Sequence, residues 1–170
     1  TNGNTQMLTE RLDGIVSDPA SIGVLMALIY AIASVAQLVV GRLIDRFPVK
    51  PLFFGVVASQ ILLFALAAHS TGWVWYVLAI AYMVSVFGAI PFSDAMVVRY
   101  IDDSMRSRLS GIRIAISFGI SSLAVYMLGP FVKSAGFTQL LVVMSCIAAV
   151  SALIVLWLPG EAQMSAASRA

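Results

Sequence analysis

The charged side chains that are spaced to act together lie in two short segments of an otherwise apolar chain. The first segment, residues 41–51, reads GRLIDRFPVKP and contains Gly41, Asp45, Arg46 and Lys50. Gly41 and Asp45 are four residues apart, so they lie on nearly the same face of a helix. A carboxylate at a helix end can accept hydrogen bonds from the unpaired N–H groups that begin a neighbouring helix. The segment can therefore join two helix ends, although the residues alone favour a plain, positively charged turn.

The second segment, residues 94–113, places one carboxylate ahead of several arginines. Asp94 is followed by Arg99, Arg106 and Arg113. Asp94 lies about 33 Å along a helix from the start of the preceding apolar run, at a rise of about 1.5 Å per residue. Because that length exceeds the hydrocarbon core of a bilayer, about 30 Å thick, Asp94 is expected near a membrane surface. We therefore expect it to pair with one of the arginines at a gate rather than to carry protons.

Residues typical of catalysis are scarce. Cys146 is the only cysteine and His69 the only histidine. The sequence contains no nucleophile–base pair, phosphate-binding loop, nucleotide fingerprint or cluster of metal ligands. We therefore expect no catalytic residue, no metal and no cofactor, so the chain is not predicted to be an enzyme. The net charge of +2 is too small to indicate binding of nucleic acid.

Composition indicates a chain that crosses a membrane. Of the 170 residues, 61% are hydrophobic and only 11% are charged, whereas a soluble domain has about 25% charged residues. Each crossing takes about 20 apolar residues in a helix, because lipid cannot hydrogen-bond to free backbone groups. We therefore predict an all-α, polytopic transmembrane helix bundle with five spans. The spans are expected at about residues 22–44, 52–68, 73–93, 112–132 and 138–158.

Lysine and arginine are distributed unequally between the two ends of these spans. Eight of the ten lie in residues 41–51, in residues 94–113 or near the C-terminus, and only Arg11 and Lys133 lie on the opposite side. Positive charge accumulates on the cytoplasmic side of membrane proteins. We therefore expect the first group to be cytoplasmic and residues 1–21 to be external, in a protein of the bacterial inner membrane.

The start of the sequence has an unusual position in this topology. The chain begins with Thr1 and shows no signal peptide. An external N-terminus without a preceding span suggests that at least one more span lies upstream. The sequence is therefore expected to be a fragment.

A stripe of small and polar residues runs along the first span. Tyr30, Ser34 and Gln37 share a sector of roughly 80° with three small residues, and the other faces are aliphatic. Polar side chains within a span usually face the protein interior or a water-filled cavity. Close packing between helices explains the small residues equally well, but Tyr30 and Gln37 favour a substrate cavity.

The third and fourth spans offer four more uncharged polar side chains as cavity candidates. These residues are Tyr82, Ser93, Ser117 and Ser121. The serines could instead hydrogen-bond to carbonyls of their own helix. The second and fifth spans are plainer, so they are expected at the periphery of the bundle.

The first charged segment resembles the cytoplasmic loop signature of the major facilitator superfamily, which joins the second and third helices of each six-helix half. Gly41, Asp45, Arg46 and Lys50 match that signature, whereas Pro48 replaces its usual glycine. Val49 likewise replaces a usual basic residue. The segment at residues 91–113 resembles the family's connection between helices ten and eleven. There Arg106 and Gly111 fit, and Ser107 replaces a glycine.

The resemblance implies an architecture for the whole chain. The five spans would correspond to helices eight to twelve, and residues 1–21 to the external end of helix seven and the loop after it. The two charged segments would form a conformational gate, comprising Gly41, Asp45, Arg46, Lys50, Asp94, Arg99, Arg106, Gly111 and Arg113.

Together, the residues and the resemblance predict a secondary active transporter of a small solute that works by alternating access. Its expected partners are a small-molecule substrate, the lipid bilayer and the missing N-terminal half of the same transporter. The alternative is a five-span membrane protein that does not transport, such as a sensor or an assembly subunit.

Overall fold

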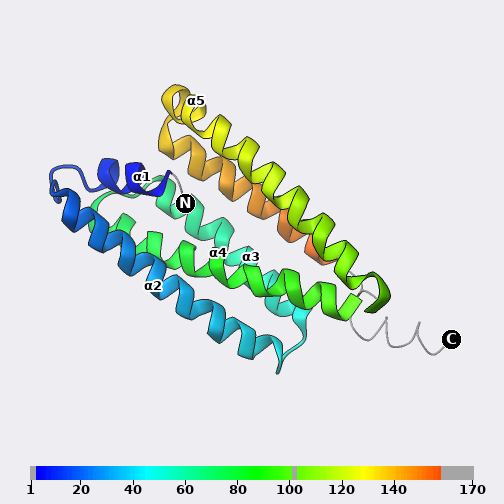
Figure 1. Cartoon of the computed structure of the whole chain (residues 1–170). Helices are drawn as coiled ribbons and strands as arrows, with labels where there is room; N and C mark the ends of the chain where they lie inside the picture. The colour runs from blue at the N-terminus through cyan, green and yellow to red at the C-terminus, as the bar shows by residue number, and fades with distance from the viewer. Residues whose placement is uncertain (1–2, 101–102, 158–170) are drawn as a thin grey trace.

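The chain forms a bundle of long helices in the computed structural model, which describes residues 3–100 and 103–157. Figure 1 shows the helices running side by side along the length of the bundle, with the short first helix across one end. The expected all-α fold is confirmed. The helices are α1 (Asn4–Arg11), α2 (Pro19–Ile44), α3 (Val49–Ala68), α4 (Gly72–Tyr100) and α5 (Asp103–Trp157).

Within the described residues, four helical segments are long and apolar enough to cross a membrane, and the last, Ser107–Trp157, has 51 residues. That length is more than twice the roughly 20 residues of one crossing. α5 reverses at Gly136, whose φ of 78° and ψ of 170° are not helical. We call residues 103–135 the first arm of α5 and residues 137–157 the second arm. The two arms lie side by side, coloured yellow and orange in Figure 1.

The start of α2 is fixed by a side chain. Asp18 precedes the helix, and its carboxylate accepts hydrogen bonds from the Ser21 backbone N–H at 3.0 Å and the Ser21 hydroxyl at 2.9 Å. Pro19 occupies the first turn, where its missing N–H costs nothing. The hydrogen bond from the Ser21 side chain, and then that from its backbone, lower the pKa of Asp18 below its usual value of 3.8.

This cap predicts a dependence of stability on pH. A carboxylate whose pKa is lower in the folded protein stabilises the fold above its unfolded pKa, and this stabilisation is lost as pH falls through the folded pKa. Asp18→Ala should therefore lower the melting temperature in detergent at pH 7, and the difference from wild type should shrink below about pH 3.8. Asp18→Asn is the control, because asparagine also caps helices and does not titrate. An Ala variant that differs from wild type equally at pH 7 and pH 3 would contradict this account.

The bundle has a large apolar core towards α1 and a small one at the opposite end. Leu8, Leu12, Trp75 and Leu141 are almost completely buried in the first. The small core consists of Ile44, Val49 and Phe92, where α2 passes into α3 beside α4. The short helix α1 is thus part of the main core and not an appendage.

The first arm of α5 contrasts with this core. The second arm packs along α3, whereas residues 104–127 of the first arm are not buried at any position whose burial is described. Phe118 and Tyr126 are 70% and 80% exposed. A helix in contact with lipid on one side only would bury its other side, so this arm presents more apolar surface than the described bundle covers.

The segment at residues 94–113 differs from the expected loop. α4 continues to Tyr100 and α5 begins at Asp103, so the segment is helical apart from residues 101–102, which lie outside the described part. Methionine, leucine and arginine favour helices. The helices can therefore extend beyond the hydrocarbon core, because their backbone groups stay paired within the helix.

Candidate functional site

The stripe predicted on α2 is tied to α1 through its tyrosine. The Asn4 side-chain amide donates to the Tyr30 hydroxyl at 3.1 Å, and the Tyr30 ring packs against Phe87 with centroids 5.9 Å apart. The Ser34 hydroxyl donates to the Tyr30 carbonyl at 2.8 Å, so it is satisfied within its own helix. Gln37 is half-buried. Its amide forms no hydrogen bond with any residue that the structure describes.

The other predicted cavity residues occupy different environments. Tyr82 is only 4% exposed, and its ring packs against Phe64 with centroids 5.1 Å apart. Ser117 and Ser121 are exposed on the first arm, and the side chain of Ser93 lies outside the described part. Since α2 packs mainly against α4, and α5 mainly against α3, the structure does not bring all these candidates together.

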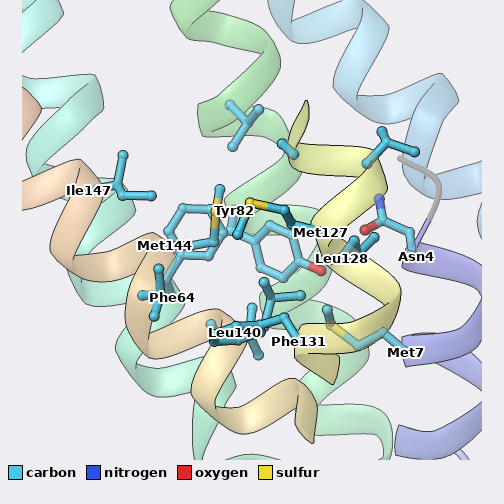
Figure 2. A pocket seen from close by; sticks show the side chains of 16 residues that line it. Asn4, Met7, Phe64, Tyr82, Met127, Leu128, Phe131, Leu140, Met144 and Ile147 are labelled. Carbon is cyan, nitrogen blue, oxygen red and sulfur yellow. The ribbon is translucent and has the colours of Figure 1, made fainter. Parts of the chain in front are cut away.

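A cavity of about 410 Å³ lies where α1, α3, α4 and both arms of α5 meet. Figure 2 shows Tyr82 at its centre, with Phe64 and Met144 on one side and Met127 and Phe131 on the other. Of the predicted cavity residues whose side chains the structure describes, Tyr82 alone contributes to its wall. The wall is apolar apart from Tyr82 and Asn4.

Asn4 is a site residue that the sequence did not reveal. It lines the cavity and donates to Tyr30, and its amide also lies 3.7 Å from the Met83 sulfur. It therefore connects the cavity to the stripe on α2. Asn4 lies outside the apolar runs, and its partners are 26 and 79 residues away, so no local pattern could identify it.

At the opposite end of the bundle, an ion pair between described residues joins α4 to α5. Arg113 pairs with Asp94, which is one of the three partners predicted for this carboxylate. The Asp94 side chain is 66% exposed and that of Arg113 is 34% exposed, so the contact lies at the surface of the helix ends. The side chains of Arg99 and Arg106 lie outside the described part.

The first charged segment also contacts α5. The Lys50 ammonium donates to the Leu156 carbonyl at 2.9 Å, which places a positive charge at the C-terminal end of that helix, where it is favourable. Asp45 ends α2 and is exposed, and no described residue donates a hydrogen bond to its carboxylate.

Three other residues of the predicted gate have open surroundings. Arg46 is exposed, as is Gly111. A Cβ atom added at Gly41 or at Gly111 would meet nothing within 4 Å. Neither glycine is therefore needed for close packing against any residue that the structure describes.

Arg11 is a second residue whose role the sequence did not show. Its guanidinium donates to the Ser70 carbonyl at 3.0 Å and the Ala68 carbonyl at 3.4 Å, at the end of α3, and to the Thr138 hydroxyl at 2.8 Å, on α5. A cation at a helix C-terminus is favoured by the helix dipole. Arg11 therefore holds α1 against two other helices.

Polar side chains also join α3 to its neighbours midway along the bundle. The Gln60 amide donates to the Ser85 carbonyl at 3.0 Å, and the Ser59 and Ser85 hydroxyls lie 3.0 Å apart. The Ser145 hydroxyl donates to the Ile61 carbonyl at 2.9 Å. Gln60 thus has a partner on α4, and such bonds between helices hold membrane bundles together.

Comparison with protein families matches residues 7–169 to the Major Facilitator Superfamily. The comparisons with curated proteins and with solved structures found no match. The matched region covers nearly the whole chain and contains both charged segments, the stripe on α2 and the long apolar helices. Members of this family are multi-pass integral membrane proteins that transport small molecules and are not enzymes. The chain therefore belongs to the Major Facilitator Superfamily.

Proposed function

We propose that the chain is the C-terminal half of a secondary active transporter that moves a small solute by alternating access, and that it has no enzymatic activity. The family match carries this proposal. The amide of the half-buried Gln37 supports it, because it has no partner among the described residues and a polar group placed against lipid would cost about 4–8 kcal/mol without one. A water-filled path beside α2 would remove that cost.

The proposed N-terminal half would cover surfaces that the described bundle leaves open. The first arm of α5 exposes Ser117 and Ser121 together with large apolar side chains. A partner surface along this arm would give the two serines a protein or aqueous environment. The end bearing Asp94, Arg113 and Lys50 would face the cytoplasm of a bacterial cell, because most of the lysines and arginines lie there.

The proposed gate would work through the charged helix ends. The ion pair between Asp94 and Arg113 joins α4 to α5, and Lys50 joins the start of α3 to the end of α5. These contacts tie three helices of this half together at one end. Asp45 and Arg46 are exposed beside them and are available to the other half in one closed state.

Cysteine accessibility at position 37 tests the proposal. Gln37→Cys in a Cys146→Ala background should react with a membrane-impermeant thiol reagent from either side of sealed vesicles, because the path opens alternately to each side. Leu38→Cys is the matched control, since Leu38 is 66% exposed on an apolar face and lipid should protect it. If the reagent reaches position 37 from one side only, or not at all, alternating access along α2 is refuted.

A further inference from the structure

The cavity around Tyr82 is large enough for a ligand. Its volume of about 410 Å³ falls within the range of about 300–1,000 Å³ that is usual for ligand sites. Sixteen residues from α1, α3, α4 and both arms of α5 form its wall. Because residues from several helices contribute to it, the cavity is a feature of the fold and not of one helix.

The wall excludes ions and suits an apolar molecule. None of the sixteen residues that line the cavity is charged, and moving an ion from water into such a site without a counter-charge is very costly. Phe64 and Phe131 offer aromatic surfaces, which pack well against rings. Met127 and Met144 are flexible and can adjust to different shapes.

Two polar groups give the cavity a point of specificity. Tyr82 is 4% exposed, and Figure 2 shows its hydroxyl directed into the cavity, towards the first arm of α5. Within the described part of the chain, this hydroxyl has no hydrogen-bond partner. Asn4 uses its amide N–H to bond Tyr30, which leaves its carbonyl oxygen as an acceptor. A ligand hydroxyl could accept from Tyr82 and donate to Asn4.

We propose that this cavity binds an uncharged, mostly apolar solute with a single hydroxyl or similar group, and that solutes of this class are what the protein transports. The claim about transport rests on the function proposed above. The claim about binding stands on the cavity alone.

Binding of 2-naphthol to the protein in lipid nanodiscs tests the site, with empty nanodiscs measuring partition into lipid. Binding should be saturable, and naphthalene-2-sulfonate, with the same rings and a negative charge, should bind at least about tenfold more weakly. Tyr82→Phe should weaken 2-naphthol binding about fivefold, the value of one hydrogen bond, and leave the binding of naphthalene unchanged. Equal affinities for 2-naphthol and the sulfonate would overturn the proposal.

Filling the cavity gives a second, independent test. Met144→Trp should abolish the saturable binding, because the indole would occupy the space beside Phe64. Leu153→Trp is the control: Leu153 lies on the same arm, is 60% exposed and does not line the cavity. If Met144→Trp melts as wild type does and still binds 2-naphthol with wild-type affinity, the site is wrong.

The two proposals fail in different ways. If the thiol reagent labels position 37 from both sides but 2-naphthol does not bind, the proposed transport function is supported and the proposed binding site is refuted. If 2-naphthol binds as described but the reagent does not label position 37 from both sides, the binding site is supported and the proposed transport function is refuted.

Discussion

Gly136→Ala should lower the free energy of unfolding by about 2 kcal/mol, because the backbone at this position suits only glycine. With φ at 78° and ψ at 170°, a Cβ atom would meet the local backbone whatever space surrounds the residue. A Cβ at Gly136 would have no other atom within 4 Å. The penalty is therefore conformational and not a clash with a neighbouring helix.

The consequence for the fold is large because Gly136 is the point where α5 reverses. The substitution should favour a continuous helix at the expense of the turn that lays the second arm against α3. Unfolding by sodium dodecyl sulfate, followed by circular dichroism, measures the loss. Gly129→Ala is the matched control, since Gly129 lies within the first arm with open space around it. There alanine should stabilise by up to about 1 kcal/mol. Equal stabilities for the two variants would contradict this role of Gly136.

The helices themselves could be predicted from the sequence because their signals are local. Runs of apolar residues must be helical in lipid, and α2 and α3 end at their expected limits, Ile44 and Ala68, whereas α4 continues beyond its expected end to Tyr100. The helical ends of α4 and α5 near Asp94 and Arg113 could not be predicted in the same way. Charge marks where a chain leaves the membrane, but it does not mark where the helix stops.

The site was only partly predictable, because its contacts join distant parts of the chain. Tyr82 stands out in the sequence as a polar side chain within an apolar span, and it lines the cavity that we propose as a binding site. Asn4 and Arg11 were not identified, since their partners lie on α2, α3 and α5. The spacing of residues within 4–11 does not indicate which other helices these residues contact.

The charged and uncharged contacts between helices occupy different levels of the bundle. Among the described residues, the charged contacts between helices lie at the two ends of the bundle, at Arg11 on one side and at Asp94 and Lys50 on the other. Between them the links are uncharged, such as that from Gln60 to the Ser85 carbonyl. A charge is far more costly to bury in hydrocarbon than an amide or hydroxyl that has a partner. The mid-membrane links can thus hold helices together without a charge.

The largest loss of stability is expected for Arg11→Ala, at about 3 kcal/mol. Each hydrogen bond from a charged donor contributes about 1.5–3 kcal/mol, and neighbouring bonds do not add fully. The substitution removes the bonds to Ser70, Ala68 and Thr138, and it leaves two carbonyls at the end of α3 without their cation.

Two variants separate this role from a general effect of charge. Arg11→Lys keeps the charge but loses the forked geometry that reaches α3 and α5 together, so it should fall between wild type and Arg11→Ala. Lys133→Ala removes an exposed cation that has no hydrogen bond within the described part of the chain, and it should change stability by less than about 0.5 kcal/mol. Thermal unfolding in detergent gives the order of the variants. If Arg11→Ala melts at the same temperature as Lys133→Ala, Arg11 does not hold α1 in place, and α1 depends on its buried leucines alone.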